Sequence, residues 1–223
     1  MALKKNNTSI STDDFNLLIK LYKSKQFAKA EVRIKEMISQ FPNDINLHNL
    51  LGIIFFEKKE LNKAIAYFKN VLAIKPDYAE AHNNIGNVLR EQKNFKEAML
   101  YFRKALEIKP KFAEAYNNIG ILFKNQEQFE KAILHYRKSI SIMPKLPNPY
   151  NNIGNALRQI GNFDEAVRNF NKAIEINPNF ADAYNNLALT LQKQKKYDQA
   201  LACYAKAIKI NPDFHDAKYN LGY

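Results

Sequence analysis

The chain has 223 residues, a formal net charge of +12 and 46% hydrophobic residues, which is enough for a continuous core. Its single cysteine, Cys203, excludes an internal disulfide and a zinc cluster, and it fits a reducing compartment. The start lacks the apolar segment of a secretory signal, and no apolar run approaches the roughly 20 residues that a membrane span needs. We therefore expect a cytoplasmic protein.

The positive charge is spread thinly along the chain, without a strongly basic segment. A basic balance favours nucleic acid as a partner when the charge gathers on one face. The even spread favours a general compositional background instead. Binding of single-stranded nucleic acid is kept as an alternative function.

Three residue types share one period of 34 residues. Proline recurs at Pro42, Pro76, Pro110, Pro144, Pro178 and Pro212. Alanine recurs at Ala30, Ala64, Ala98, Ala132, Ala166 and Ala200. Glycine recurs at Gly52, Gly86, Gly120, Gly154 and Gly222, with Ala188 in its place once. A shared period predicts a linear array of repeats in which each unit packs on its neighbours.

Residues 1–10 form a polar lead that we expect to be flexible. Ser11 and the acidic pair after Thr12 predict the start of a helix. The first unit has Leu18 where later units have glycine, as expected of a terminal unit with one face in water. The expected full units are 11–44, 45–78, 79–112, 113–146, 147–180 and 181–214.

Residues 215–223 begin a seventh unit that has no second helix. An uncovered apolar stripe invites association. We therefore expect the parent protein to continue beyond this point, and we expect the open end to permit end-to-end self-association.

The unit over 113–146 predicts two antiparallel helices. Tyr116, Ile119, Gly120 and Phe123 form one apolar stripe, and a second stripe runs from Phe129 through Ala132 and Tyr136 to Ile140. The polar segment 125–127 separates the stripes, and Pro144 ends the second helix. Gly120 and Ala132 are expected to be small because the two helices approach closely there.

The pattern Tyr-x2-Ile-Gly-x2-Phe, then Ala-x3-Tyr, then Pro resembles the tetratricopeptide repeat. The resemblance covers the chain from residue 11 onward. It implies an all-α fold, a right-handed α-solenoid of helix-turn-helix units with six full repeats and a partial seventh. It also implies that the first helix of each pair lines a concave groove.

No catalytic constellation is visible, so we expect a segment that is not an enzyme and needs no cofactor. The sequence has no glycine-rich phosphate loop, nucleophile elbow or HExxH motif. His48 and His82 occupy the position of Tyr116 in other units and are expected to fill an aromatic slot between units; we expect no metal site. Cys203 is expected to be inert packing.

Asparagine forms the most informative column. Asn84, Asn118, Asn152, Asn186 and Asn220 each precede the glycine position, and we call them the asparagine ladder. The residue before each is again asparagine at Asn83, Asn117, Asn151 and Asn185, and Asn87 and Asn155 follow the glycine. Asparagine disfavours helices. Because Asn84 and Asn87 share a helical face with Glu80 and Arg90, away from the apolar stripe, the column is predicted to face the groove.

A row of carboxamides suits an extended polypeptide. Each amide offers both a donor and an acceptor to a peptide backbone. Stacked helices place equivalent residues about 10 Å apart, so each amide would meet about every third residue of an extended peptide. The column resembles the asparagine ladder of the protein O-linked N-acetylglucosamine transferases, which implies capture of extended substrate polypeptides. The second unit has Leu50, which is expected to end the ladder, and the alternative is that these asparagines bond to one another between units.

Chaperone-adaptor repeats bind a C-terminal carboxylate through Lys-x3-Asn, an asparagine, and Lys-x3-Arg. The matching positions here hold Asn83 and Asn87, then Asn118, then Asn148 and Asn152, so all three cations are missing and that use is rejected. Arg90, Lys124 and Arg158 do repeat at the far ends of three first helices. They are either solvated helix ends or groups that steer acidic ligands.

The sequence therefore predicts a protein-binding scaffold that holds extended polypeptide. We expect it to be the recognition segment of a larger protein, such as a glycosyltransferase or other transferase. Nucleic-acid binding and a purely structural spacer or oligomerisation element remain the alternatives.

Overall fold

The computed structural model describes residues 10–221 and the side chains of residues 10–220. Residues 1–9 of the expected lead, and Gly222 with Tyr223, lie outside this range. The described residues contain thirteen helices and no strand. The boundary between two compact units falls between Pro110 and Lys111.

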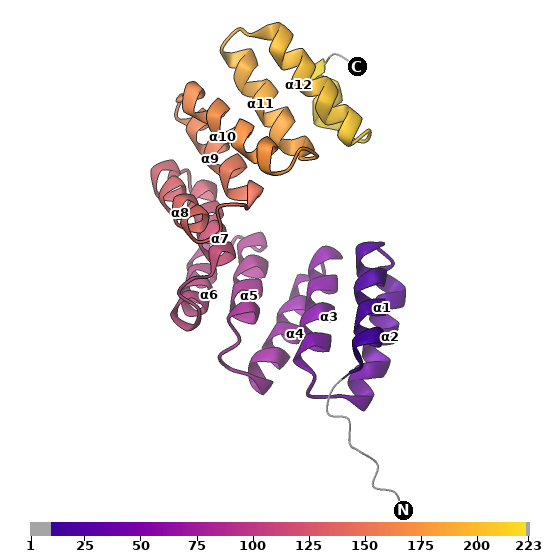
Figure 1. The fold of residues 1–223 in the computed structure, drawn as a ribbon. Helices are drawn as coiled ribbons and strands as arrows, with labels where there is room; N and C mark the ends of the chain where they lie inside the picture. Colours follow the sequence, from indigo (N-terminus) through magenta and orange to yellow (C-terminus); the bar gives the residue numbers. More distant parts are fainter. Residues whose placement is uncertain (1–9, 222–223) are drawn as a thin grey trace, which may run out of the picture. The chain divides into compact units, whose positions relative to one another are not determined.

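The first unit contains six helices in three pairs (Figure 1). They are α1 (Thr12–Lys23), α2 (Phe27–Gln40), α3 (Ile45–Glu57), α4 (Leu61–Ile74), α5 (Ala79–Glu91) and α6 (Phe95–Ile108). The hydroxyl of Ser11 accepts a hydrogen bond from the Asp14 N–H at 3.1 Å, so the predicted N-cap is confirmed. Each helix packs on the next, and α3 also contacts α5.

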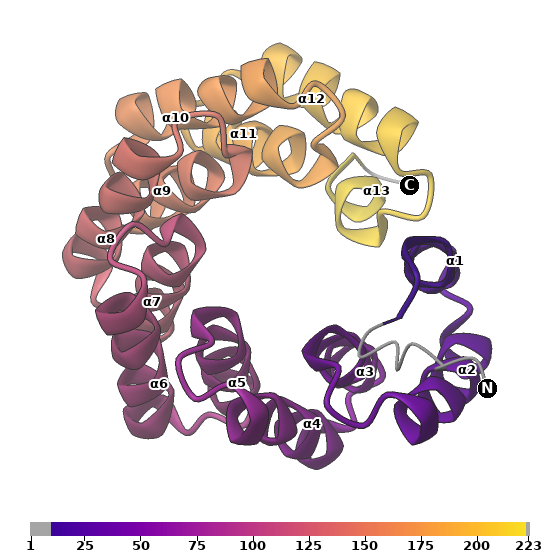
Figure 2. The same cartoon turned by 60° about the horizontal axis from the view of Figure 1, so that its bottom comes forward.

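The second unit repeats this arrangement. It contains α7 (Ala113–Asn125), α8 (Phe129–Ile142), α9 (Pro147–Gln159), α10 (Phe163–Ile176), α11 (Ala181–Lys193), α12 (Tyr197–Ile210) and the short α13 (His215–Leu221). Here α9 contacts both α7 and α11, so the first helices of successive pairs lie side by side, while α8, α10 and α12 form the other layer (Figure 2). The fold is an all-α solenoid of helical hairpins.

Four of the helix pairs in the described residues have an aromatic ring packed over a glycine. A Cβ added to Gly120 would lie 2.5 Å from the Tyr136 ring, and one added to Gly154 would lie 2.6 Å from the Phe170 ring. Gly52 and Gly86 face Phe68 and Phe102 in the same way. At the glycines the space that a larger residue would need is occupied by an aromatic side chain of the second helix.

The turn inside each hairpin needs a left-handed residue. The φ angle is positive at Lys25, Lys59, Lys93, Glu127, Gly161 and Lys195, which are again 34 residues apart. Only Gly161 among these adopts this conformation without a steric penalty from Cβ. The turn of 113–146 begins at Gln126, one residue later than predicted, because Asn125 is still the last residue of α7.

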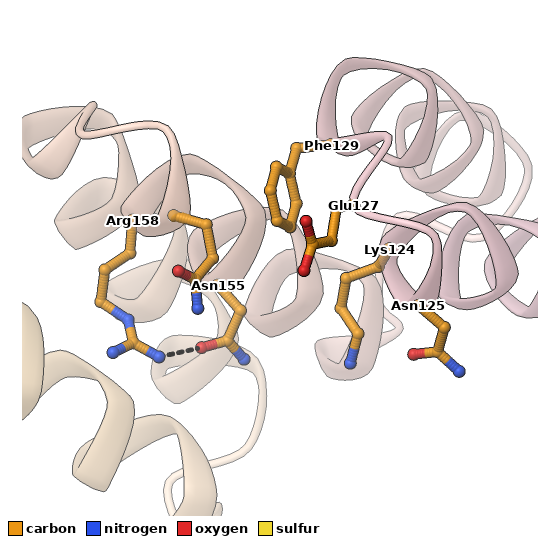
Figure 3. A pocket seen from close by; sticks show the side chains of 7 residues that line it. Lys124, Asn125, Glu127, Phe129, Asn155 and Arg158 are labelled. Atoms are coloured by element: carbon orange, nitrogen blue, oxygen red, sulfur yellow. Dashed lines mark hydrogen bonds between the residues drawn. The ribbon is translucent and has the colours of Figure 1, made fainter.

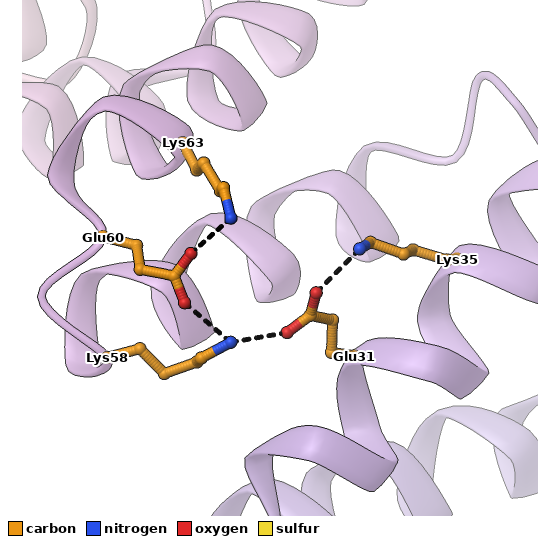
Figure 4. A network of polar contacts seen from close by, with 5 residues as sticks. All are labelled: Glu31, Lys35, Lys58, Glu60 and Lys63. Carbon is orange, nitrogen blue, oxygen red and sulfur yellow. Dashed lines mark hydrogen bonds and ion pairs between the residues drawn. The ribbon is translucent and has the colours of Figure 1, made fainter.

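A chain of ion pairs ties the first two hairpins together (Figure 4). The Glu31 carboxylate on α2 lies 2.7 Å from Lys35 Nζ and 2.7 Å from Lys58 Nζ. Lys58 also lies 2.7 Å from the Glu60 carboxylate, which pairs with Lys63 at 2.5 Å. Hydrogen bonds from Lys58 and then Lys63 lower the pKa of Glu60 from 4.5 to about 2.

This network predicts a pH dependence of stability. The folded pKa of Glu60 lies below its ordinary value, so its contribution is present above pH 4.5 and is lost as the pH falls toward about 2. Glu60→Gln is expected to lower the urea midpoint slightly at neutral pH, and this deficit should shrink in acid. Urea titrations of both proteins across this range measure it. A difference in urea midpoint that stays constant with pH would contradict the lowered pKa of Glu60 as the source of this stability.

Candidate functional site

Asparagine side chains connect successive first helices. Asn152 Nδ2 on α9 donates to Asn117 Oδ1 on α7 at 3.0 Å, and Asn186 Nδ2 on α11 donates to Asn151 Oδ1 at 3.1 Å. In the first unit, Asn84 Nδ2 donates to Asn49 Oδ1 at 3.0 Å. Each of these three ladder amides therefore bonds to the asparagine 35 residues earlier. This is the arrangement described above as the alternative, in which the asparagines bond to one another between repeats.

These bonds use part of the capacity of each ladder amide. A carboxamide has two N–H donors and an oxygen with two lone pairs. Asn152 and Asn186 are half-buried, and each donates one N–H to the preceding repeat. Within the described residues their Oδ1 atoms accept no hydrogen bond. The bond to the neighbour holds the amide in one orientation while its oxygen and second N–H remain for a ligand.

The ladder position of the second repeat holds Leu50, where the sequence predicts that the ladder ends. Leu50 is buried in the core, but Asn49 beside it accepts the bond from Asn84 and so extends the amide row into the second repeat. Asn49 lies 34 residues before Asn83. The same period that revealed the other asparagines would have found it.

The remaining asparagines have different environments. Asn83, Asn151 and Asn185 are buried, whereas Asn87, Asn117, Asn118, Asn155 and Asn220 are half-buried. Asn155 Oδ1 accepts a hydrogen bond from Arg158. The Oδ1 atoms of Asn87 and Asn185 are buried without a hydrogen-bond partner among the described residues. The column is therefore not a uniform row of exposed amides.

Two of the three predicted cations line one pocket of about 470 Å³ in the second unit (Figure 3). Its lining residues are Lys124, Asn125, Glu127, Phe129, Asn155, Arg158 and Gln159. Arg90 belongs to the other unit, and its side chain is 13% exposed. Arg158 is half-buried as well. Both arginines are therefore less solvated than the ends of exposed helices.

The two histidines of the aromatic column lie within their own hairpins. The ring centroid of His48 lies 6.1 Å from that of Tyr67, and His82 lies 5.9 Å from Tyr101. Both partner tyrosines belong to the second helix of the same pair, so these ring contacts lie within one hairpin, whereas Pro42 and Pro76 belong to the preceding unit. Each Nε2 also lies within hydrogen-bond distance of a proline carbonyl, Pro42 or Pro76.

Cys203 is half-buried on α12, and burial raises the pKa of its thiol, which fits a packing role. Over residues 10–220, no group of histidine, cysteine, aspartate and glutamate side chains is placed to hold a metal ion. None of the helices in the described part of the chain combines the length and apolar character of a membrane span.

Stacked helical hairpins with a polar first-helix face define a helical-repeat interaction scaffold. The model described as "TPR repeat" matches residues 52–89 and 154–195, and the model "Tetratricopeptide repeat" matches 79–112, 113–146 and 181–214. Together they cover most of the chain, which belongs to the tetratricopeptide-repeat family. The prediction of this family is confirmed.

Solved structures show the same fold. PilW, a type IV pilus biogenesis factor, matches 99% of this chain and 100% of its own with a TM-score of 0.79 and 23% identity. A chain of the APC/C hetero-tetramer Cut9–Hcn1 matches 98% of this chain with a TM-score of 0.84 and 15% identity, and this chain spans 43% of its length. YrrB, a TPR protein with an unusual peptide-binding site, matches 84% of this chain and 96% of its own with a TM-score of 0.57 and 24% identity. A comparison with curated proteins finds no match.

Proposed function

We propose that this protein-interaction scaffold binds an extended polypeptide along the asparagine ladder. The observation that carries the proposal is the inter-repeat bonding of Asn152 and Asn186, which orients both amides and leaves their oxygens available. An amide held by the protein loses little further entropy when it meets a ligand, and this favours binding. A backbone N–H group of the peptide would donate to each oxygen, independent of its side chains.

The spacing of the repeats supports an extended ligand. Helices that pack side by side lie about 8–10 Å apart, and an extended chain advances about 3.3 Å per residue. Successive ladder amides would therefore reach every third residue of one peptide. A ligand in helical form would have few free backbone N–H groups to offer the amides, because its own hydrogen bonds use them.

We also propose a role for this chain within a longer protein, as the sequence predicts. In this proposal the chain is the recognition segment of a longer cytoplasmic protein, without catalytic activity of its own, and a transferase is one candidate for the rest of it. YrrB, which shares the fold, has a peptide-binding site of its own, and a peptide ligand for the present chain is our proposal.

Replacing Asn118, Asn152 and Asn186 by alanine tests the proposal. The probe is an array of dodecapeptides of random sequence, acetylated and amidated at their ends, and the hits are measured by fluorescence anisotropy. We expect affinity to fall about 100-fold, since each lost hydrogen bond contributes about 1 kcal/mol. The substitutions also remove inter-repeat bonds, so helicity at the assay temperature must be confirmed by circular dichroism.

The matched control replaces the exposed asparagines Asn148, Asn171 and Asn179 by alanine. This triple variant should bind as the wild type does. Unchanged affinity in a folded ladder variant, or equal losses in both variants, would refute the ladder as the binding site. Strong binding of single-stranded RNA that weakens steeply with salt, with no peptide bound, would favour the nucleic-acid alternative instead.

A further inference from the structure

Arg158 is a cation whose hydrogen-bonding capacity is largely unused. Its Nη2 donates to Asn155 Oδ1 at 3.1 Å, while its Nε is buried without an acceptor among the described residues. A guanidinium has five N–H donors and stays charged in proteins. No carboxylate within residues 10–220 forms an ion pair with Arg158. A half-buried cation without a counter-ion is costly, so it marks a place where an anion would be stabilised.

The pocket around Arg158 has room for a side chain. It measures about 470 Å³ and lies between the C-terminal part of α9 and the end of α7 with the turn that follows it. In Figure 3 the Arg158 guanidinium and Asn155 lie on one side, whereas Lys124 and Glu127 approach from the other. The ring of Phe129 forms an apolar wall between them.

The carboxylate of Glu127 repels an incoming anion, and the strength of this repulsion depends on where the carboxylate lies in the pocket. Figure 3 shows its carboxylate beside Phe129 and Lys124, away from the Arg158 guanidinium. The lining therefore has two cations and one carboxylate, and the positive group farthest from Glu127 is Arg158. A single carboxylate at Arg158 is favoured, while a polyanion such as a nucleic-acid backbone would meet repulsion from Glu127.

The pocket continues the asparagine ladder. Asn152, Asn155 and Arg158 are spaced by three residues on α9, so they share one helical face. A polypeptide bound at Asn152 would pass within reach of the pocket. The next repeat has Gln192 in place of Arg158, and its amide accepts a hydrogen bond from the Tyr204 hydroxyl at 3.3 Å. The positive charge at this position, present at Arg90, Lys124 and Arg158, therefore ends before the repeat that holds Gln192.

We infer that this pocket binds the carboxylate of an acidic side chain from the polypeptide held on the asparagine ladder. The inference rests on the proposed function and adds a sequence preference to it. The guanidinium of Arg158 donates N–H groups to the carboxylate, a charge-assisted hydrogen bond of the kind that arginine favours. In this proposal the ring of Phe129 contacts the methylene groups of the acidic side chain of the ligand.

The test uses acetylated and amidated dodecapeptides that carry Glu, Gln or Lys at one scanned position on a common background. For the wild-type chain we expect one position at which Glu binds about tenfold more tightly than Gln, as for a charge-assisted hydrogen bond. Arg158→Gln should reduce this ratio to near one. Arg168→Gln, on the exposed face of α10, is the matched control and should keep the ratio.

Arg158→Glu gives a second readout that a merely structural role would not move. It should reverse the preference, so that the Lys peptide binds more tightly than the Glu peptide at the same position. Peptide binding without any Glu preference, or a preference that survives in Arg158→Gln, would overturn the pocket assignment and leave the ladder intact. Dependence on a free C-terminal carboxylate in place of the side chain would overturn it too. Absence of binding by every peptide would instead reject the proposed function.

Discussion

Replacing Phe170 by alanine is expected to lower the free energy of unfolding by about 4 kcal/mol. Its ring is fully buried on α10 and lies over Gly154, in a core cluster that also includes Ile153 and Leu187. The glycine has no side chain that can move into the space the ring would leave. The loss of transfer free energy is therefore joined by the cost of an open cavity.

Urea unfolding followed by circular dichroism measures this effect. Tyr197→Ala is the matched control, because Tyr197 is an aromatic residue on the neighbouring α12 with 57% of its surface exposed. The control should lose less than about 1 kcal/mol. Similar losses for the two variants would show that the ring at position 170 is not the lock between α9 and α10.

Gly120→Ala is expected to destabilise the chain by about 2 kcal/mol, against the usual trend for a helix. Alanine favours a helix interior by about 1 kcal/mol over glycine. At this position, however, the new Cβ would lie 2.5 and 2.6 Å from two atoms of the buried Tyr136 ring. Overpacking of that kind costs about 3 kcal/mol when a ring and its helix must shift.

A double-mutant cycle distinguishes this clash from other effects. Tyr136→Leu in the Gly120→Ala background should recover part of the lost stability, so that the two changes are not additive. Ala188→Gly supplies the matched control, since the chain already has alanine at this position, which is equivalent to Gly120 two repeats later. That variant should lose helix propensity with no steric relief. A stabilised Gly120→Ala protein would show that the ring has room to move.

The binding and packing predictions depend on different atoms of the same helices. Gly120 and Gly154 face the second helix of their own hairpins, whereas Asn117 and Asn152 face the neighbouring hairpin. A substitution in the ladder should therefore weaken ligand binding more than it destabilises the hairpin. A substitution at a glycine should do the reverse. Measuring both affinity and unfolding for each variant keeps the two roles apart.

The sequence by itself determined the helical hairpins and their family. A 34-residue period in proline, alanine and glycine leaves few other folds, because each residue type has one conformational or packing role in the hairpin. It also identified the asparagine column and the arginines, since helical periodicity shows which residues share a face.

Only the tertiary structure decided what those side chains contact. The bond from Asn152 to Asn117, the part played by Asn49, the placement of His48 beside Tyr67 and the burial of Arg158 all depend on how one helix is staggered against the next. Periodicity along one helix defines direction around its axis, but it does not define the offset between two helices. That offset determines which amide lies within hydrogen-bond distance of which, and it follows from how the side chains of two neighbouring helices pack.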